Sequence, residues 1–228
     1  SGQNPARQAA IRAGLPHAVP AMTLNKVCGS GLKALHLGAQ AIRCGDADVI
    51  IAGGMESMSN APYLMKKHRA GARIGHDTVI DTMMMDGLED AYDKGKAMGV
   101  FAEDCAAKYS FTREQQDALA LESHQRAEKA WAEGRFKDQI VPIEIKGRKG
   151  PVTFDTDEHP KETGLDKLAG LKAVFKKDGS VTAGNASGIN DGAAALVLAR
   201  ADAAQAAGLT PRARILGYAV AGVRPEVM

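Results

Sequence analysis

Cys28 is the residue whose type and surroundings best suit covalent chemistry. It stands in the segment Asn-Lys-Val-Cys-Gly-Ser-Gly at 25–31, between an apolar stretch and a segment with helical spacing. A cysteine at a strand-to-helix corner, followed by small residues, is open to a substrate. The positive end of the helix dipole also stabilises a thiolate, the nucleophilic form of cysteine. A lone cysteine beside glycines is more often a small buried residue, so this segment alone leaves both interpretations open.

The other cysteines and the histidines suggest no second chemical site. Cys44 ends a helical segment, and Cys105 shares a predicted helical face with Tyr109, so we predict that both cysteines pack against neighbours. Three cysteines without a CxxC pair or an even framework favour a reducing compartment. None of the six histidines has the spacing of a zinc helix or knuckle, so we predict no metal.

Further motifs continue along the chain after the cysteine. They are GQNPARQA at 2–9, GDADVIIAGGMES at 45–57, Met98-Gly99, FKD at 136–138 and TAGNASG at 182–188. Together with CGSGLKAL at 28–35, they make the chain resemble the thiolase family from its first residue to its last. Within that family, the nearest resemblance is to the acetyl-CoA acetyltransferase type, which makes or cleaves acetoacetyl-CoA and similar short 3-ketoacyl-CoA esters.

The resemblance implies an α/β fold of the thiolase kind, with a mixed sheet between helices and an added α+β loop domain. Family members carry an Asn-Glu-Ala-Phe, a Gly-His-Pro and a Cys-x-Gly-Gly-Gly motif in their C-terminal half, and none of these occurs here. The chain is therefore expected to be an internal fragment with an incomplete N-terminal half. The expected divisions are 1–57 and 188–208 for that half, 58–187 for the CoA-binding loop domain, and 209–228 for the start of the C-terminal half.

The resemblance also implies roles for particular residues. Cys28 matches the nucleophile, and its backbone N–H is expected to contribute to an oxyanion hole. Ser187 matches the serine that hydrogen-bonds the pantetheine arm of CoA, and Ala183 a backbone contact to that arm. Met98 and Leu88 match apolar residues that line the pantetheine and acyl slot. The serine could instead cap a turn, and the two apolar residues could be ordinary core.

Two positions depart from the family pattern. Where many relatives have an arginine-proline pair, this chain has Lys172-Ala173 before Phe175. Lysine offers no planar guanidinium for stacking on adenine, so the CoA contact expected at Lys172 changes in geometry. Ala97 stands where acetoacetyl-CoA thiolases often have histidine, which leaves the acyl preference open.

The implied reaction converts two acetyl-CoA to acetoacetyl-CoA and CoA, or runs in reverse as thiolysis, through an acyl-cysteine at Cys28. CoA takes part as substrate and product, and no separate cofactor is expected. Three alternatives stay open: a longer-chain 3-ketoacyl-CoA thiolase, a related ketoacyl synthase, and a catalytically incomplete CoA-binding fragment. The resemblance further implies a homo-oligomer, dimer or tetramer, and a place in cytoplasmic fatty acid metabolism, while the physiological direction stays open.

Composition excludes several other classes of protein. The 228 residues are 45% hydrophobic, enough for a substantial core. The formal charge of +2 gives no overall field for nucleic acid or an anionic membrane. No apolar run approaches the roughly 20 residues of a membrane helix, and the visible N-terminus shows no signal pattern.

Hydrophobic periodicity and turn residues predict the elements that position these groups. Helices are expected at 4–14, 31–43, 95–109, 112–134 and 201–207, and Thr112 and Gln115 have the spacing of a capping box at the start of the fourth. Strands are expected at 19–27, 48–52, 140–146, 193–199 and 215–223, and 146–163 is expected to be turn-rich. The order strand, helix, strand over 19–52 predicts a parallel right-handed crossover, with the second strand buried on both faces and turning sharply at Gly53-Gly54. The basic stretch 66–73 is expected to contact CoA phosphates, form an oligomer contact or remain a solvated loop.

Overall fold

The computed structural model describes residues 2–227, and its chain divides into two compact units. The first unit holds the chain up to Gly87 together with Asn190–Gly222. The second holds Leu88–Ile189 together with the chain from Val223 onward. Each unit is described by itself.

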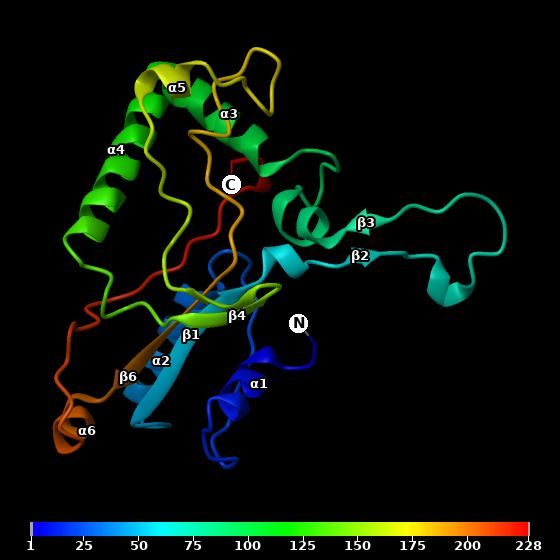
Figure 1. Cartoon of the computed structure of the whole chain (residues 1–228). Helices are drawn as coiled ribbons and strands as arrows, with labels where there is room; N and C mark the ends of the chain where they lie inside the picture. Colours follow the sequence, from blue (N-terminus) through cyan, green and yellow to red (C-terminus); the bar gives the residue numbers. More distant parts are fainter. Residues whose placement is uncertain (1, 228) are drawn as a thin grey trace. The chain divides into compact units, whose positions relative to one another are not determined.

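The first unit is built on one long helix and one pair of strands. Its main elements are α1 (Pro5–Arg12), α2 (Ser30–Cys44), β1 (Val49–Glu56), β6 (Gly192–Ala199) and α6 (Ala201–Ala206). The two strands pair antiparallel over eight residues, from Val49 opposite Ala199 to Glu56 opposite Gly192. Helix α2 lies along one face of this pair (Figure 1). The predictions of both strands and all three helices are confirmed.

Apolar side chains of β1 alternate between the helix and solvent. Ala52 is buried, and Ile50 lies against Gly38 of α2, where an added Cβ would stand 3.3 Å from the Ile50 side chain. Val49, Ile51 and Met55 are each more than half exposed on the other face. The prediction that both faces of this strand are buried is therefore wrong for the described residues, because α2 covers only one face.

The prediction of a sharp turn at Gly53-Gly54 is also wrong. Both glycines lie inside β1, which continues to Glu56. A Cβ placed on Gly53 would lie 2.2 Å from the carbonyl oxygen of Ala194 on the neighbouring strand. Glycine is needed here because the two backbones approach closely, which no side chain would permit.

Two predicted strands do not form among the described residues. Residues 19–27 run as irregular chain, and so do residues 215–223. In the first case the Arg7 guanidinium donates to the carbonyl oxygen of Val19 at the start of this stretch and to that of His17 just before it. The predicted parallel crossover is consequently absent, and each sheet of the described chain is an antiparallel pair.

An extended arm follows β1 and runs to Gly87, the last residue of the first unit before the chain enters the second. It consists of short helical turns and a two-residue strand pair: η1 (Met58–Asn60), β2 (Tyr63–Leu64), η2 (His68–Ala70), β3 (Ile80–Asp81) and η3 (Met84–Leu88). The last of these is a π-helical turn that ends at the boundary between the units. The basic stretch 66–73 lies between β2 and β3, in the outer part of this arm.

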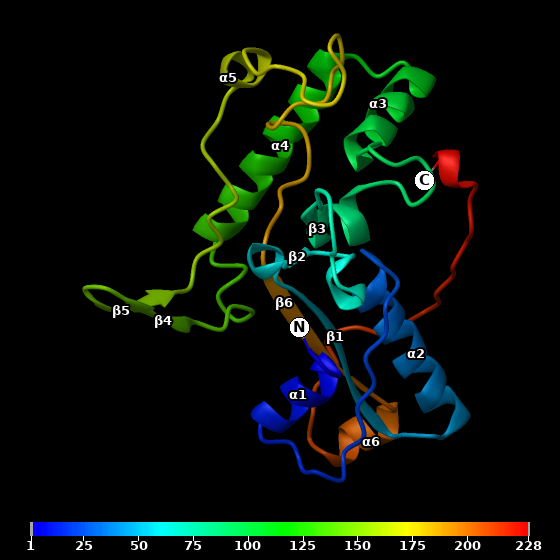
Figure 2. The ribbon, with the colours of Figure 1, turned by 90° about the vertical axis from the view of Figure 1, so that its right-hand side faces the viewer.

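The second unit is mainly helical. Its elements are α3 (Met98–Tyr109), α4 (Arg113–Ala132), β4 (Ile143–Gly147), β5 (Gly150–Phe154), α5 (Leu165–Ala169) and η4 (Pro225–Val227). Figure 2 shows α5 close to the N-terminal part of α4, in agreement with their contacts. Strand β5 lies in the stretch expected to be turn-rich and pairs with β4 as a hairpin.

The start of α4 confirms the predicted capping box. The Thr112 hydroxyl accepts from the backbone N–H of Gln115, and the Gln115 side chain accepts from the backbone N–H of Thr112. Two of the otherwise unpaired donors at this helix start are thereby satisfied.

The predicted packing of Cys44 and Cys105 is wrong for the described chain. Both thiols are exposed, as is that of Cys28. Helix α3 buries Phe101, Glu103 and Ala106 instead, so its buried face excludes Cys105. Among residues 2–227, no helix is both long and apolar enough to cross a membrane. No three metal-ligating side chains gather in that part of the chain, and the absence of a metal stays a prediction.

Candidate active site

Cys28 lies in a tight turn that leads directly into α2. The backbone N–H of Gly29 donates to the carbonyl oxygen of Lys26 at 3.0 Å, and that of Ser30 to Val27 at 3.1 Å. Helix α2 begins at Ser30, two residues after the cysteine. The thiol is therefore exposed at the helix start, as the sequence predicts for this corner.

The residue before the cysteine has a strained backbone. Val27 has φ 48°, in the left-handed region. A β-branched residue rarely adopts this conformation, because its Cβ crowds the neighbouring carbonyl oxygen. Such strain costs of order 1–3 kcal/mol and persists only where surrounding interactions hold it.

Two polar side chains hold the turn in this conformation. The Asn25 carboxamide oxygen accepts from the backbone N–H of Val27 at 2.8 Å. The Ser30 hydroxyl accepts from the N–H of Lys26 at 2.8 Å and donates to the carbonyl oxygen of Val27 at 2.7 Å. These three hydrogen bonds fix the backbone of Lys26 and Val27. The backbone conformation that precedes Cys28 is therefore set by residues within the same turn.

The N-terminus of α2, with its partial positive charge, begins two residues after Cys28. Its N-cap residue is Gly29, which provides no side-chain cap. The first N–H groups of a helix have no partner within the helix and carry a partial positive charge. Negative charge that forms next to Cys28 is stabilised by these groups, which suits a thiolate and the oxyanion of an acyl-transfer step.

The other predicted site residues all belong to the second unit. Ala183 and Ser187 lie in a loop at 180–187, and both are exposed. Leu88 ends the π-helical turn η3, and Met98 begins α3; both are half-buried. Lys172 is exposed and follows α5. Cys28 belongs to the first unit, so the structure describes the predicted nucleophile and the predicted CoA-contact residues as two separate groups.

The loop at 180–187 is shaped by its own polar groups. The Asn185 carboxamide oxygen accepts from the N–H of Thr182 at 2.7 Å, and its nitrogen donates to the carbonyl oxygen of Ser180 at 3.0 Å. The Thr182 hydroxyl accepts from the N–H of Gly184 at 3.1 Å. Thr182 is completely buried, and the exposed Ala183 follows it directly.

The loop also packs against the segment that carries Lys172. A Cβ on Gly184 would lie 2.6 Å from methyl carbons of both Leu168 and Leu171, so a larger residue would force these side chains or the backbone to shift. The backbone N–H of Val174 donates to Val181 at 3.0 Å. Residues 168–174, which carry Lys172, therefore form a layer that packs against residues 181–184 of the loop.

The motif analysis missed the acidic residues that hold this loop. Glu103 of α3 and Asp117 of α4 are 5% and 3% exposed, and both are linked to the loop by hydrogen bonds. A useful signal was present, since Glu103 lies between the apolar Phe101 and Ala106 on a helix expected to pack. A charged residue is seldom fully buried unless it has partners.

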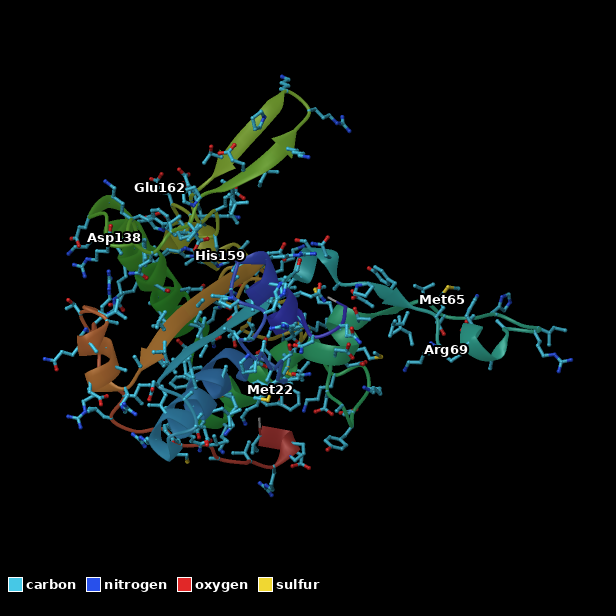
Figure 3. The ribbon with its side chains drawn as sticks, turned by 90° about the horizontal axis from the view of Figure 1, so that it is seen from below. Met22, Met65, Arg69, Asp138, His159 and Glu162 are labelled. Atoms are coloured by element: carbon cyan, nitrogen blue, oxygen red, sulfur yellow. The ribbon has the colours of Figure 1, made fainter. Side chains whose placement is uncertain are left out.

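The basic stretch lies on the β2–β3 arm, where Figure 3 labels Met65 and Arg69. Lys67 donates to the carbonyl oxygen of His76 at 3.2 Å, and His68 lies 3.1 Å from an Asp77 carboxylate oxygen. These contacts tie the two sides of the arm together. Contact of this stretch with CoA phosphates or with another subunit stays a prediction.

Comparison with known proteins decides the family. The family model described as the thiolase N-terminal domain matches residues 1–202. The chain belongs to the thiolase family. The acetyl-CoA acetyltransferase of Pseudomonas aeruginosa is 62% identical over 230 residues, covering all of this chain and 58% of that relative. The enzyme of the same name from Allochromatium vinosum is 56% identical with the same coverage.

A solved structure agrees with this assignment. The crystal structure of the Bacillus anthracis acetyl-CoA acetyltransferase matches with a TM-score of 0.93 and 49% identity, covering 98% of this chain and 57% of that chain. The predicted α/β thiolase fold is confirmed, with only part of that fold represented. The chain spans less than three-fifths of the length of these thiolase relatives.

Proposed function

We propose that the full-length protein is a thiolase of the acetyl-CoA acetyltransferase type. One observation carries the proposal: an exposed cysteine stands on a strained, braced turn at an uncapped helix N-terminus, in a chain 62% identical to a relative of that name. A thiol in this position is open to a thioester and has backbone donors beside it.

The proposed first step is acyl exchange between two sulfur atoms. The Cys28 thiolate attacks the carbonyl carbon of acetyl-CoA, a new carbon–sulfur bond forms, and the bond to CoA breaks. CoA leaves as a thiolate that takes up a proton. Because one thioester replaces another, this step costs little free energy and frees the first CoA.

In the proposed second step the acetyl group passes to carbon. A second acetyl-CoA loses a proton from its methyl group, and the resulting carbanion attacks the acyl-cysteine. The carbon–sulfur bond to Cys28 breaks, which releases acetoacetyl-CoA and restores the thiolate. Thiolysis is the same sequence in reverse. The groups that move these protons are expected from family motifs that do not occur in the present 228 residues.

The second unit is proposed to bind CoA. Ser187 and Ala183 are exposed on a loop of defined shape, which suits contact with an extended pantetheine arm. The half-buried Leu88 and Met98 provide apolar surface for the arm and the acyl group, and the exposed Lys172 provides a positive charge for a phosphate. CoA enters as substrate and product, without a separate cofactor.

Finer properties belong to the same proposal. A cytoplasmic location is supported by three free cysteines, which suit a reducing compartment. A homo-oligomer, dimer or tetramer, is supported by apolar side chains on the uncovered face of β1. A role in fatty acid metabolism follows from the proposed substrates. A longer-chain 3-ketoacyl-CoA thiolase is the second candidate, because the small Ala97 precedes Met98 at the proposed acyl slot.

The test is mass spectrometry of the purified full-length protein before and after incubation with acetyl-CoA, followed by peptide mapping. We expect one acetyl group on the peptide that contains Cys28 and none in a Cys28→Ala variant. Acetylation confined to the peptides of Cys44 or Cys105, or no acetylation of a folded full-length protein, would overturn the proposal. Repeating the incubation with longer acyl-CoA esters separates the two candidate substrates.

A further inference from the structure

Two buried carboxylates in the second unit have no part in the chemistry proposed above. They are Glu103 on α3 and Asp117 on α4, 5% and 3% exposed. A buried carboxylate is costly to desolvate unless charge-assisted hydrogen bonds satisfy it. Both side chains reach the same short segment, residues 180–185, which immediately precedes Ser187. Because both carboxylates bind this segment, we ask whether together they fix its conformation.

Glu103 holds the start of the segment. Its carboxylate accepts from the backbone N–H of Ser180, at 3.0 Å to each oxygen, and from the N–H of Val181 at 2.8 Å. The Ser180 hydroxyl lies 3.1 Å away as a further donor. Burial raises the pKa of Glu103, but the hydrogen bonds from Ser180 and Val181 outweigh burial, so the pKa lies below its ordinary value. The carboxylate is thus ionised at neutral pH.

Asp117 holds the end of the segment. It accepts from the Asn185 side-chain nitrogen at 2.9 Å, and its other oxygen accepts from Arg113 at 2.8 Å. Arg113 also donates to the carbonyl oxygens of Leu168 and Leu171, at 2.6 and 3.0 Å. Asp117 therefore connects the loop, through an ion pair, to the layer of residues that carries Lys172.

The loop is held at residues 180–181 and at Asn185, and Ser187 follows two residues after the second anchor. Ala183 and Ser187 are exposed, and Thr182 between the two anchors is completely buried. A mobile loop would lose conformational freedom each time a ligand bound, and that loss weakens affinity. Anchoring the loop by long-range charge-assisted bonds removes this cost before the ligand arrives.

We propose that Glu103 and Asp117 are positioning residues that hold the 180–187 loop in the conformation in which Ala183 and Ser187 meet the pantetheine arm of CoA. This inference rests on the proposed function. It assigns the two carboxylates a role in CoA affinity that is separate from the acyl chemistry at Cys28.

The test compares a thioester that has the arm with one that lacks it. Glu103→Gln and Asp117→Asn are made in the full-length protein, and CoA binding is measured by calorimetry. Acetylation of Cys28 is then timed with acetyl-CoA and with S-ethyl thioacetate, a small thioester without a pantetheine arm. We expect CoA affinity to fall by about tenfold, which corresponds to about 1.4 kcal/mol. Acetylation by S-ethyl thioacetate should stay within about twofold of the unaltered protein, because that substrate does not use the loop.

Two further variants keep the result interpretable. Glu122→Gln removes a carboxylate from the exposed surface of α4, where it pairs with Arg126, and should leave both measurements unchanged. Ser180→Ala removes the hydroxyl donor to Glu103, together with the acceptor of a bond from Gln116, but keeps both backbone bonds to Glu103. It should shift CoA affinity in the same direction by a smaller factor, even if the carboxylate variants unfold.

Each outcome decides between the two claims. Unchanged CoA affinity in Glu103→Gln and Asp117→Asn would overturn the inference, and so would an equal loss of acetylation with both thioesters, which indicates general damage. An unaltered full-length protein that neither binds CoA nor becomes acetylated would overturn the proposed function and the inference together. Loss of CoA affinity with normal acetylation by S-ethyl thioacetate supports both.

Discussion

The turn around Cys28 and the loop that carries Ser187 are held in different ways. The hydrogen bonds that brace Val27 join residues two to four positions apart. The bonds that anchor the 180–187 loop join residues 68 to 78 positions apart. The first region therefore owes its geometry to its own segment, whereas the second combines short-range bonds of its own with anchors from two helices. A substitution near Cys28 should act locally, and one far away in sequence can still disturb the loop.

Cys28→Ala should produce the largest effect and make the contrast sharpest. If the nucleophile belongs to the first region alone, thiolysis should fall by at least about a thousandfold in the full-length protein. CoA affinity, which we propose depends on the second region, should change by less than about twofold. Steady-state kinetics and calorimetry on the same preparation measure both. Cys44→Ala, which also removes an exposed thiol, is the matched control and should keep full activity.

Gly184→Ala tests the second region by overpacking it. The added Cβ would meet Leu168 and Leu171 at 2.6 Å, so these leucine side chains or the loop must shift. We expect a loss of about 1–3 kcal/mol in the free energy of unfolding. CoA affinity should weaken, while acetylation by S-ethyl thioacetate should persist.

Gly170→Ala is the control for this overpacking. A Cβ at Gly170 meets its nearest atoms at 3.6 Å, and its backbone has ordinary helical angles. This variant should be as stable as the unaltered protein or more stable by about 0.5 kcal/mol. If urea unfolding gave the same free energy of unfolding for Gly184→Ala and Gly170→Ala, the loop would not be tightly packed at Gly184.

Glu103, which anchors the loop of the second region, should make the free energy of unfolding depend on pH in the acid range. Hydrogen bonds keep the pKa of this carboxyl below its ordinary value of 4.5 despite burial. Its contribution is therefore fully present above about pH 4.5, begins to fall below that value, and is lost as the pH passes through the lower folded pKa. Urea unfolding should show that Glu103→Gln flattens this acid limb. An unchanged limb would mean that other carboxyl groups dominate it.

Val27→Asn should give the smallest effect, confined to the first region. Asparagine tolerates the left-handed conformation better than valine does, and the Val27 side chain is 58% exposed, so little packing is lost. We expect the free energy of unfolding to rise by about 1 kcal/mol, with CoA affinity unchanged. A decrease in stability would show that Val27 makes contacts that outweigh its backbone strain.

Elements governed by local rules were predicted well from the sequence. Helices α1, α2 and α4 follow apolar spacing, and the capping box at Thr112 forms as expected. The corner at Cys28 also follows, because glycine and serine after the cysteine allow a turn into a helix. These signals lie within one helical turn of the residues they govern.

Elements that depend on a distant partner were not predictable in the same way. Residues 19–27 have the composition of a strand, yet Arg7 takes two of the nearby carbonyl groups and no ladder forms among the described residues. Strand β5 was missed because charged and turn-forming residues flank it, and its pairing with β4 provides the stabilisation. Strand propensity depends on neighbours more than helix propensity does.

The sequence by itself determined the family, the α/β class and the local environment of the candidate nucleophile, because motifs and turn chemistry act over a few residues. Only the tertiary structure decided that Gly53 lies inside a strand, that Cys105 is exposed, and that Glu103 and Asp117 hold the loop before Ser187. The physical reason is that burial and long-range hydrogen bonds depend on which segments meet in space. The spacing of residues along the chain carries little information about these tertiary contacts.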